Sequence, residues 1–484
     1  MVKVINKIVS KYRDLSIHSK SMLWFSICGV VQTAITSLTT PIFTRIMSTE
    51  EYGQFSIYAS WFSILSIFVT LNINAVIGNL GINNFWEDRK KFIASSQILS
   101  SVSVAFFLIL FLLGNSTFSN MIGLPSWIIV IMFIHMMIQP AYSLWSTLLR
   151  FEYKYKEVVA FSWSYTLVYT VIGIIAVITS QDKGIAKICS YAGVQIVLFA
   201  IIYLINCKCI TNVKDITRYW KFTLKHSIKL IPHGMANQVL AKSDILMINY
   251  YVGVDKAGIY SLGYSLAMIV TVFTTGINNA LMPWLFEQMK KKNIDLVGKY
   301  VNKLVTFILL IDLTIMIMAP EILKIFASKT YYEAINIIAP VVAAVFFIFL
   351  YGLFANVEIF YQDTSFFAVV SPVIAVVNII LNALLIPRFG YVMGAYTTLF
   401  SYMLYCVFHY WKMKKLLLQK MGVKNIYNIS FMFLAACVQI GAMVVVSILY
   451  NYTAIRYGII ALVCILPIVF RKQIMEVVHE ISNK

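Results

Sequence analysis

The chain has 484 residues, of which 60% are apolar and only 12% carry a charge. Soluble domains are about 45–50% apolar and about 25% charged, so this composition excludes a soluble globular domain and also a disordered, collagen-like or disulfide-stapled chain. The net charge of +19 would indicate nucleic-acid binding in a soluble protein, whereas a membrane protein collects Lys and Arg in its cytoplasmic loops. We therefore expect an all-α polytopic membrane protein that binds no nucleic acid.

The N-terminal segment, residues 1–20, is the first element of the chain. Basic residues from Lys3 to Lys20 interrupt any apolar core in it, so we do not expect a signal peptide. Its pattern predicts either a short helix on the membrane surface or a solvated leader, in both cases on the cytoplasmic side.

Apolar runs of about 20 residues can cross the hydrocarbon core of a bilayer as helices. We predict fourteen such spans, separated by charged residues, Pro, Gly and Asn. They lie at 21–46, 54–80, 92–114, 125–149, 157–180, 184–206, 227–252, 258–283, 301–325, 335–360, 366–387, 391–411, 429–450 and 455–470. Most connections are short, so consecutive helices should run antiparallel.

The longest central connection, 207–226, separates two groups of six spans and a final pair. A shift of 205 residues aligns the two groups and places Gly53 on Gly258 and Asn74 on Asn279. We therefore predict two pseudo-symmetric six-helix lobes and a C-terminal helix pair. The predicted segments are an N-lobe at 21–206, a cytoplasmic linker at 207–226, a C-lobe at 227–411, a cytoplasmic loop with helices 13 and 14 at 412–470, and a cytoplasmic tail at 471–484.

Lys and Arg are unevenly divided between the two sides that this order of spans defines. Most of the 39 lie in connections on the side of the N-terminus, and few lie on the opposite side. Cytoplasmic loops carry such an excess, so we expect both termini in the cytoplasm.

Ionisable and polar side chains inside a span are candidates for function, because their burial in a bilayer is costly. The seventh span holds most of them, namely His233, Asn237, Gln238, Lys242 and Asp244. A buried Lys242 needs a counter-charge, so it would face either an anionic ligand or a carboxylate on another helix.

The remaining candidates lie on other spans. Arg45 ends the first span, and Asp312 lies in the ninth, where it would serve ion or proton coupling or pair with Lys242. Asn74 and Asn279 lie on equivalent polar stripes, which would either line a cavity or let helices pack closely. The cavity candidates are Arg45, Lys242, Asn237, Gln238, Asn74 and Asn279, and the coupling candidates are Asp244, Asp312 and His233.

Two further ionisable residues are interpreted as structural. His135, alone in the fourth span, is expected to be packed rather than to titrate, and Glu358, near the end of the tenth span, is expected to be solvated.

The sequence contains no phosphate-binding loop, no His-Glu-x-x-His and no Gly-x-Ser-x-Gly motif. We therefore expect neither an enzyme nor a metal or cofactor site. Transport by such a chain would be secondary, driven by an H⁺ or Na⁺ gradient, the membrane potential or the substrate gradient.

Three segments resemble the signature of bacterial polysaccharide flippases. They are PIFTRIMSTEEYGQFSIYAS at 41–60, DILMINYYVGVDKAGIYSLGYS at 244–265 and ALMPWLFEQM at 280–289. The chain is similar over its whole length to Wzx-like O-antigen and polysaccharide flippases of the multidrug/oligosaccharidyl-lipid/polysaccharide exporter superfamily.

The resemblance implies a function in the bacterial inner membrane. Members move undecaprenyl-pyrophosphate-linked oligosaccharides from the inner to the outer leaflet by alternating access, for O-antigen, capsule or related glycans. Their cationic central cavity is best matched here by Arg45 and Lys242, and membrane lipids and the pathway's polymerase and chain-length proteins are the implied partners. The alternative is a cation-coupled multidrug antiporter of the same superfamily, which Asp244 and Asp312 keep open.

Overall fold

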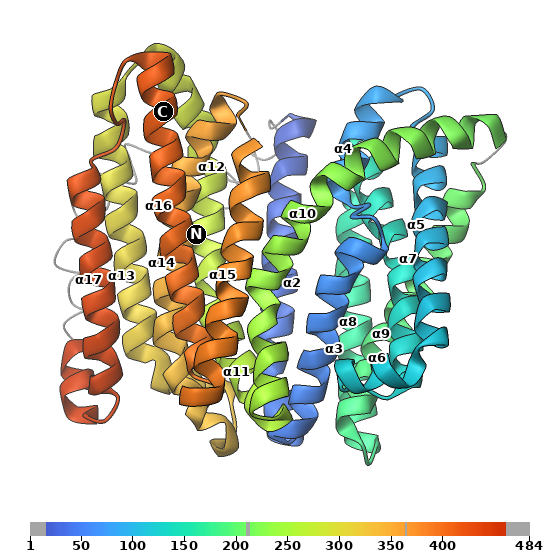
Figure 1. Cartoon of the computed structure of the whole chain (residues 1–484), viewed down its shortest axis with the longest axis horizontal. Coiled ribbons are helices and arrows are strands. Elements are labelled where there is room, and N and C mark those ends of the chain that lie inside the picture. Colours follow the sequence, from blue (N-terminus) through green and yellow to red (C-terminus); the bar gives the residue numbers. More distant parts are fainter. Residues whose placement is uncertain (1–15, 210–212, 364, 461–484) are drawn as a thin grey trace, which may run out of the picture. The chain divides into compact units, whose positions relative to one another are not determined.

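The computed structural model describes residues 16–209, 213–363 and 365–460. Every regular element in these residues is a helix (Figure 1). Ten of the described helices are long and apolar enough to cross a membrane, so the expectation of an all-α polytopic membrane protein is confirmed. Contacts divide the chain into two compact units, Met1–Gly258 and Ile259–Lys484.

The first unit is a bundle in which α7 and α9 hold central positions. α7 packs against α5, α8 and α9, and α9 also packs against α3. Its core is apolar and contains Ile57, Met132 and Ile188. The elements are α2 (Ile17–Ile46), α3 (Thr49–Val69), α4 (Ala75–Asn84), α5 (Arg89–Leu113), α6 (Asn115–Ile122), α7 (Ser126–Phe151), α8 (Tyr155–Thr179), α9 (Lys183–Cys207) and α10 (Val213–Tyr251).

The second unit is organised around α14, which is almost wholly buried. α14 packs against α12, α13, α16 and α17, and its side chains from Ile337 to Phe347 are buried without a gap. The elements are α11 (Val254–Ala267, which begins before the unit boundary), α12 (Val270–Lys291), α13 (Ile294–Phe326), η1 (Lys329–Ala334), α14 (Ile335–Phe360), α15 (Ser365–Phe389), α16 (Met393–Met421) and α17 (Ile429–Leu449).

Four of the fourteen predicted spans are not among the ten apolar helices. The span at 54–80 is wrong as a continuous helix, because the chain is interrupted between α3 and α4. The spans at 227–252 and 391–411 are parts of α10 and α16, which are helical but carry many polar and basic residues. The span at 455–470 lies mostly outside the described residues.

The predicted linker at 207–226 is largely helical. From Val213 onward it forms one helix with the predicted seventh span, and this α10 contains Pro232. Tyr219 and Trp220 pack its first half on α4 and α5, and the Trp220 Nε1 donates to the Ser95 carbonyl at 2.9 Å. Figure 1 shows α10 crossing one end of the unit before it runs beside α3. The predicted seventh span thus falls in the first unit, and the two six-helix lobes stay a prediction.

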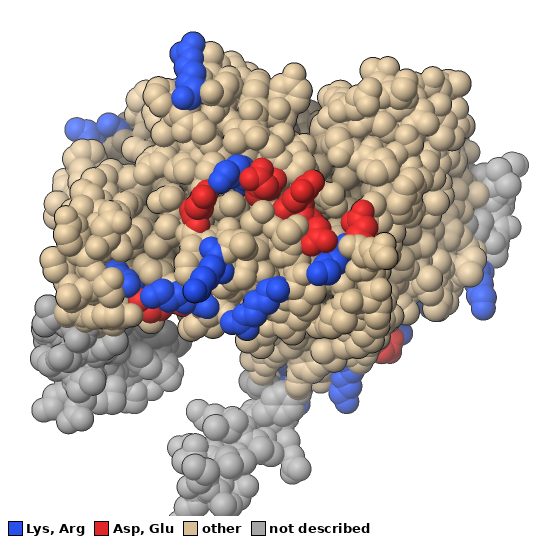
Figure 2. Space-filling model, turned by 90° about the horizontal axis from the view of Figure 1, so that it is seen from below, with Lys and Arg blue, Asp and Glu red and all other residues tan. Residues whose placement is uncertain are grey.

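The surface is mostly uncharged. Figure 2 shows one face where Lys, Arg, Asp and Glu gather near the middle, with a few more towards the edges, and other side chains cover most of the rest. Large apolar side chains such as Phe106, Leu113, Val197 and Phe433 are exposed on the helices. Exposed apolar surface on this scale is what a lipid-facing bundle requires.

Candidate functional site

A break in the backbone separates α3 from α4 at residues 70–74. Leu71 and Asn72 have φ angles of 58° and 51°, in the left-handed region that non-glycine residues rarely adopt. The backbone N–H of Asn72 donates to the Ile67 carbonyl at 2.7 Å. The Asn74 side chain accepts from the Val76 amide at 3.0 Å and donates to Asn72 Oδ1 at 2.7 Å. Irregular backbone at membrane depth occurs only where protein buries it or where it lines a polar cavity.

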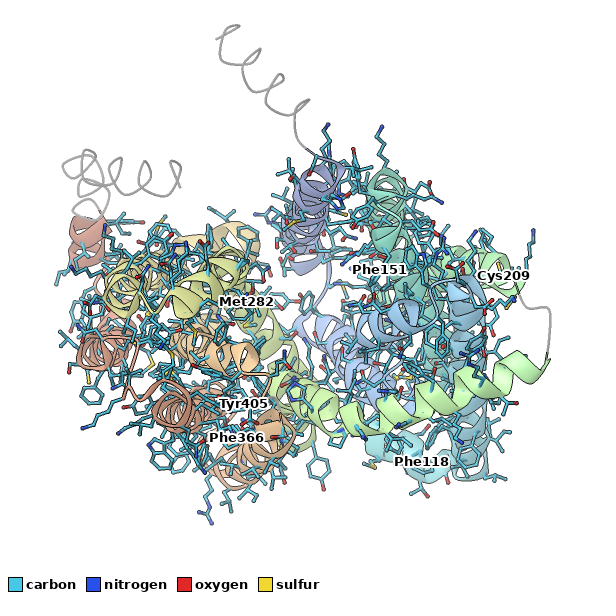
Figure 3. All side chains as sticks on the ribbon, turned by 90° about the horizontal axis from the view of Figure 1, so that it is seen from above. Phe118, Phe151, Cys209, Met282, Phe366 and Tyr405 are labelled. Carbon is cyan, nitrogen blue, oxygen red and sulfur yellow. The ribbon has the colours of Figure 1, made fainter. Side chains whose placement is uncertain are left out.

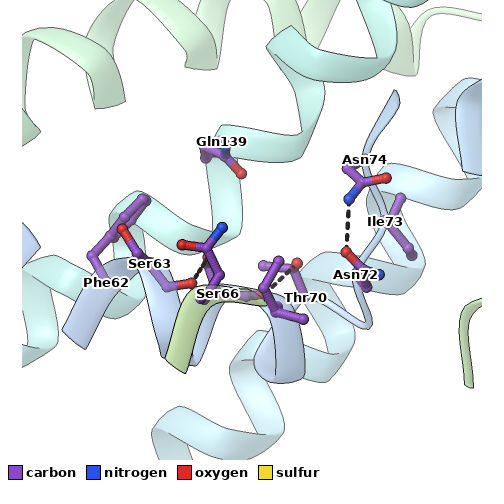
Figure 4. Close-up of a pocket in the computed structure, with 10 residues that line it drawn as sticks. Phe62, Ser63, Ser66, Thr70, Asn72, Ile73, Asn74 and Gln139 are labelled. Carbon is purple, nitrogen blue, oxygen red and sulfur yellow. Dashed lines mark hydrogen bonds between the residues drawn. The ribbon is translucent and has the colours of Figure 1, made fainter. Parts of the chain in front are cut away.

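A pocket of about 240 Å³ lies at this break (Figure 4). Hydroxyl and amide side chains make up most of its wall, and none of its residues carries a charge. The lining residues are Phe62, Ser63, Ser66, Ile67, Thr70, Asn72, Ile73, Asn74, Gln139 and Gln238. They come from α3 and the 70–74 turn that follows it, from α7 and from α10, so three parts of the chain that are distant in sequence build one site.

The hydroxyl groups on α3 share one face of the helix at spacings of three and four residues. Each donates its proton to the backbone of its own helix: Ser63 to the Ala59 carbonyl at 2.8 Å, Ser66 to the Ser63 carbonyl at 3.1 Å, and Thr70 to the Ser66 carbonyl at 2.6 Å. With their protons committed, these oxygens offer lone pairs to a ligand.

The two glutamine amides supply the complementary groups. Gln139 lies beside Pro140 on α7, and Gln238 lies on α10. Neither amide makes a hydrogen bond to another described residue. Each amide can donate two hydrogen bonds and accept two. The pocket therefore suits a neutral ligand rich in hydroxyl groups better than an ion.

The structure brings two of the predicted cavity residues, Asn74 and Gln238, into this pocket. Four others lie elsewhere. Arg45 is exposed in the last turn of α2, where a cation is favourable at the negative end of the helix dipole. Asn237 and Asn279 are exposed, and Lys242 is half-buried one turn beyond Gln238 on α10.

The three coupling candidates do not line the pocket either. His233 is half-buried, and its Nε2 lies 3.2 Å from Asn237 Nδ2. Asp244 is buried in the first unit. Asp312 is buried in the second unit, where Gln439 Nε2 donates to its Oδ2 at 3.2 Å.

Sequence reasoning missed several residues of interest. Asn72 and Gln139 both line the pocket, and the only signal for them was a polar residue inside an apolar run. Lys187 on α9 is buried, and its ammonium lies 4.0 Å from the ring centre of Phe43 and 4.5 Å from that of Tyr52, a cation–π environment.

The expectation for Glu358 is wrong. Glu358 is fully buried, and its Oε1 lies 2.7 Å from Nδ1 of His409, which is buried too. Phe366 and Tyr405, both labelled in Figure 3, come from neighbouring helices and pack against the His409 ring. The partner, His409, lies on α16, and no pattern in the sequence near Glu358 indicates it.

The expectation that His135 is packed is confirmed. His135 is buried between Tyr58 and Gln195, and its ring stacks on Phe62 at 4.2 Å. Among the described residues, no group of three or more His, Cys, Asp or Glu side chains could hold a metal ion.

Comparison with known families decides the class of the molecule. Residues 19–289, more than half of the chain, match the family model described as polysaccharide biosynthesis protein. The chain belongs to the polysaccharide biosynthesis protein family. A second model, MatE, matches residues 234–384. The matches to these families support a transporter rather than an enzyme. The fold is shared with solved transporters of the MOP superfamily.

Relatives of known sequence or structure agree with this assignment. A protein of the Lsg locus of Haemophilus influenzae is 21% identical over 338 residues, covering 64% of this chain and 80% of that protein. The inward-closed structure of the lipid II flippase MurJ superposes with a TM-score of 0.62 at 15% identity, covering 93% of this chain and all of that one. An inward-facing multidrug resistance transporter of the MATE family gives a TM-score of 0.61 at 12% identity, covering 83% of this chain and all of that one.

Proposed function

We propose that this protein flips undecaprenyl-pyrophosphate-linked oligosaccharide units from the cytoplasmic to the outer leaflet by alternating access. The product would feed O-antigen, capsule or a related surface polysaccharide. The observation that carries the proposal is the uncharged, hydroxyl- and amide-lined pocket at the helix break of a chain in the polysaccharide biosynthesis family. The fold shared with a protein named as a lipid II flippase supports it.

The pocket supports a division of labour in substrate binding. Sugar hydroxyls would donate to the oxygens of Ser63, Ser66 and Thr70 and exchange hydrogen bonds with the amides of Gln139 and Gln238. Such paired hydrogen bonds discriminate strongly, because a missing partner leaves a polar group of the site unsatisfied. Phe62 adds an apolar wall for the ring face of a sugar.

The anionic pyrophosphate needs a cation outside this pocket. Lys242 follows Gln238 by four residues on α10, so both lie on one side of that helix. We propose Lys242 as the pyrophosphate partner and Arg45, Asn237 and Asn279 as further contacts along the path. Asp244 and His233 are the candidates that we retain for coupling to an H⁺ or Na⁺ gradient. We do not retain Asp312, which is buried in the second unit against Gln439.

The proposal includes the finer architecture. Fourteen spans in two six-helix lobes and a final pair would place both termini in the cytoplasm of a bacterium, with the chain in the inner membrane. Polymerase and chain-length proteins of the same pathway would act on the flipped product.

Deletion and complementation test this function. A clean deletion should lose surface polymer and accumulate lipid-linked repeat units on the cytoplasmic leaflet, and the wild-type gene should restore both. Lys242→Ala should fail to restore export while inserting normally, and Lys242→Arg should restore it in part. Normal surface polymer in a deletion strain without a redundant transporter would overturn the proposal.

The MatE match over residues 234–384 favours one second candidate, a cation-coupled multidrug antiporter. An uncharged pocket is a poor site for cationic drugs, because it offers no carboxylate to a positive charge. Drug susceptibility of the deletion strain separates the two functions. We expect it to be unchanged, and a broad rise in susceptibility that complementation reverses would establish the antiporter.

A further inference from the structure

A buried acid and a buried amide face each other in the second unit. Asp312 on α13 and Gln439 on α17 are both 0% exposed. Gln439 Nε2 donates to Asp312 Oδ2 at 3.2 Å, which brings the two end groups together. The other two oxygens, Asp312 Oδ1 and Gln439 Oε1, have no hydrogen-bond partner among the described residues. Both of these oxygens are acceptors if the acid is ionised.

An ionised Asp312 does not fit this environment. Burying an unpaired charge is much more costly than burying a neutral group, and buried carboxylates are normally matched by a cation. The ionised form would also leave two acceptors without any donor.

The elements packed on α13 are α12, α14, α17 and η1. α17 carries no charged side chain, and the carboxylate of α14, Glu358, is bonded to His409. On α13 itself the nearest charged residues, Lys303 and Glu321, are nine positions away in each direction, or roughly 13 Å along the axis. The charged residues of α12 (Glu287, Lys290 and Lys291) lie in its last turns, and those of η1 are Lys329 and Glu333, beyond the end of α13. Arg456, which follows α17, also contacts α13, but it donates to the Ile317 carbonyl at 3.3 Å and pairs with Glu321. The described neighbours therefore show no ion pair with Asp312.

We propose that Asp312 and Gln439 form a binding site for one proton. The proton resides on Asp312 Oδ1 and is donated to Gln439 Oε1, while Gln439 Nε2 donates to Asp312 Oδ2. The acid and the amide then close a ring of two hydrogen bonds, and a single proton satisfies both oxygens that lack a partner. This neutral pair docks α17 on α13.

The site gives Asp312 a role different from coupling. A coupling carboxylate must release its proton in each cycle, whereas this one holds it to keep two helices together. Loss of the proton would place two acceptors and a negative charge at a buried contact, so the α13–α17 contact should weaken as the pH rises. The inference is independent of the cargo and of the proposed flippase function.

Asp312→Asn is the decisive variant, because an asparagine amide can donate to Gln439 Oε1 and accept from Gln439 Nε2 without any proton. In the full chain in lipid nanodiscs, the infrared difference spectrum between wild type and Asp312→Asn should show a carboxylic acid C=O band at neutral pH. The exposed Asp295, in the first turn of the same helix, provides the matched control, since Asp295→Asn should remove a carboxylate band instead. Loss of a carboxylate band from Asp312, or a band at this site that responds to Na⁺, would overturn the proposal.

Stability and export provide a second readout. The melting temperature of wild type should fall at high pH more than that of Asp312→Asn, and Asp312→Ala should melt several degrees lower at every pH. Asp312→Asn should keep export in the complementation assay. A folded Asp312→Asn protein that cannot export would show that the proton must leave, which overturns a retained proton and returns Asp312 to the coupling candidates.

Discussion

The segments 70–74 and 275–279 are aligned by the 205-residue shift, yet their backbones differ. The first is the break between α3 and α4, whereas the second lies inside the uninterrupted helix α12. The helix that precedes α12 ends earlier, at Ala267, so the regular helix of the second half is interrupted at 268–269 instead. The two segments are therefore similar in sequence, but only the first has an irregular backbone at the aligned position.

Two residues of the break have a positive φ, and Leu71 corresponds to Gly276, which tolerates such a φ better than Leu does. Only the second residue can therefore account for the difference. Asn72, which adopts a left-handed φ, corresponds to Ile277, and Asn tolerates that region several-fold better than a β-branched residue. Asn74 caps α4, while its counterpart Asn279 is exposed in the middle of α12. Two aligned asparagines therefore have different roles, because the residue two positions before each of them favours a different backbone conformation.

Asn72→Ile should have the largest effect, because it copies the second half into the first. The substitution forces a β-branched residue to a positive φ and removes the bonds of Asn72 to Asn74 and to the Leu230 carbonyl. We expect a loss of about 3 kcal/mol in stability and no export, the strain alone being about 1–3 kcal/mol. Thermal unfolding in nanodiscs measures it. The reverse change Ile277→Asn should alter stability by only a few tenths of a kcal/mol, roughly the difference in helix propensity. Equal effects at the two positions would contradict the comparison.

Gln139→Leu and Gln238→Leu come next, and they should separate binding from folding. Each removes an amide from the pocket without changing the backbone, so export should fall roughly 10- to 100-fold while the melting temperature stays near that of wild type. The rate at which lipid-linked units appear in the outer leaflet is the measurement. The matched control is Gln419→Leu, at an exposed position of α16 outside the pocket. If that control reduced export as much as the pocket variants do, the loss of export could not be assigned to binding of the cargo in the pocket.

The fold could be predicted to a large extent because hydropathy determines where helices cross a membrane. The predicted span at 335–360 coincides with α14, and that at 429–450 differs from α17 by one residue. The break at 70–74 could not be predicted in this way, since Leu71 and Ile73 keep the run apolar and hydropathy contains no information on φ. The second part of α10 was predicted as the span at 227–252, whereas its first part, at 213–226, was predicted as a linker because it is polar and basic.

The site was predicted only in part, for a related reason. Asn74 and Gln238 were identified because each is polar inside a predicted span, and both line the pocket. Gln139 was missed although it has the same property, and Arg45 was proposed although it is exposed at a helix end. Whether a polar side chain lines a cavity, caps a helix or meets solvent depends on tertiary contacts that one sequence does not specify.

Asn74→Ala tests the cap directly and has a smaller effect. The Asn74 side chain accepts from the Val76 amide, and loss of such a cap destabilises a protein by about 1 kcal/mol. Asn279→Ala should instead be neutral or slightly stabilising, because Ala has the higher propensity in a helix interior. Opposite signs in thermal unfolding would sharpen the contrast between the two asparagines, and equal destabilisation would remove it.

The smallest effect concerns the connections that follow α4 and α12. After α4, Arg89 bonds both to the Trp86 carbonyl at 2.9 Å and to Glu152, which follows α7, at 3.0 Å. At the end of α12, an ion pair joins Lys291 to Glu287 of the same helix. The first pair therefore links the start of α5 to the end of α7, while the second pair links two residues within α12.

Glu152→Gln should change how the stability of the protein depends on pH, because it removes the ion pair with Arg89. Partial burial raises the pKa of Glu152, but hydrogen bonds from Lys154 and Arg89 outweigh it and hold the pKa below its usual value. A lowered folded pKa means that the ionised form stabilises the protein above the unfolded pKa of about 4.3, and that this stability is lost as the pH falls through the folded value. Wild type should thus lose up to about 1 kcal/mol on acidification below about pH 4, and Glu152→Gln should lose less. Melting curves between neutral and acidic pH measure this. Glu287→Gln is the control, because its ion pair with Lys291 is exposed and should contribute less to the acid response. An identical acid response in Glu152→Gln and wild type would mean that the ion pair between Arg89 and Glu152 adds no stability.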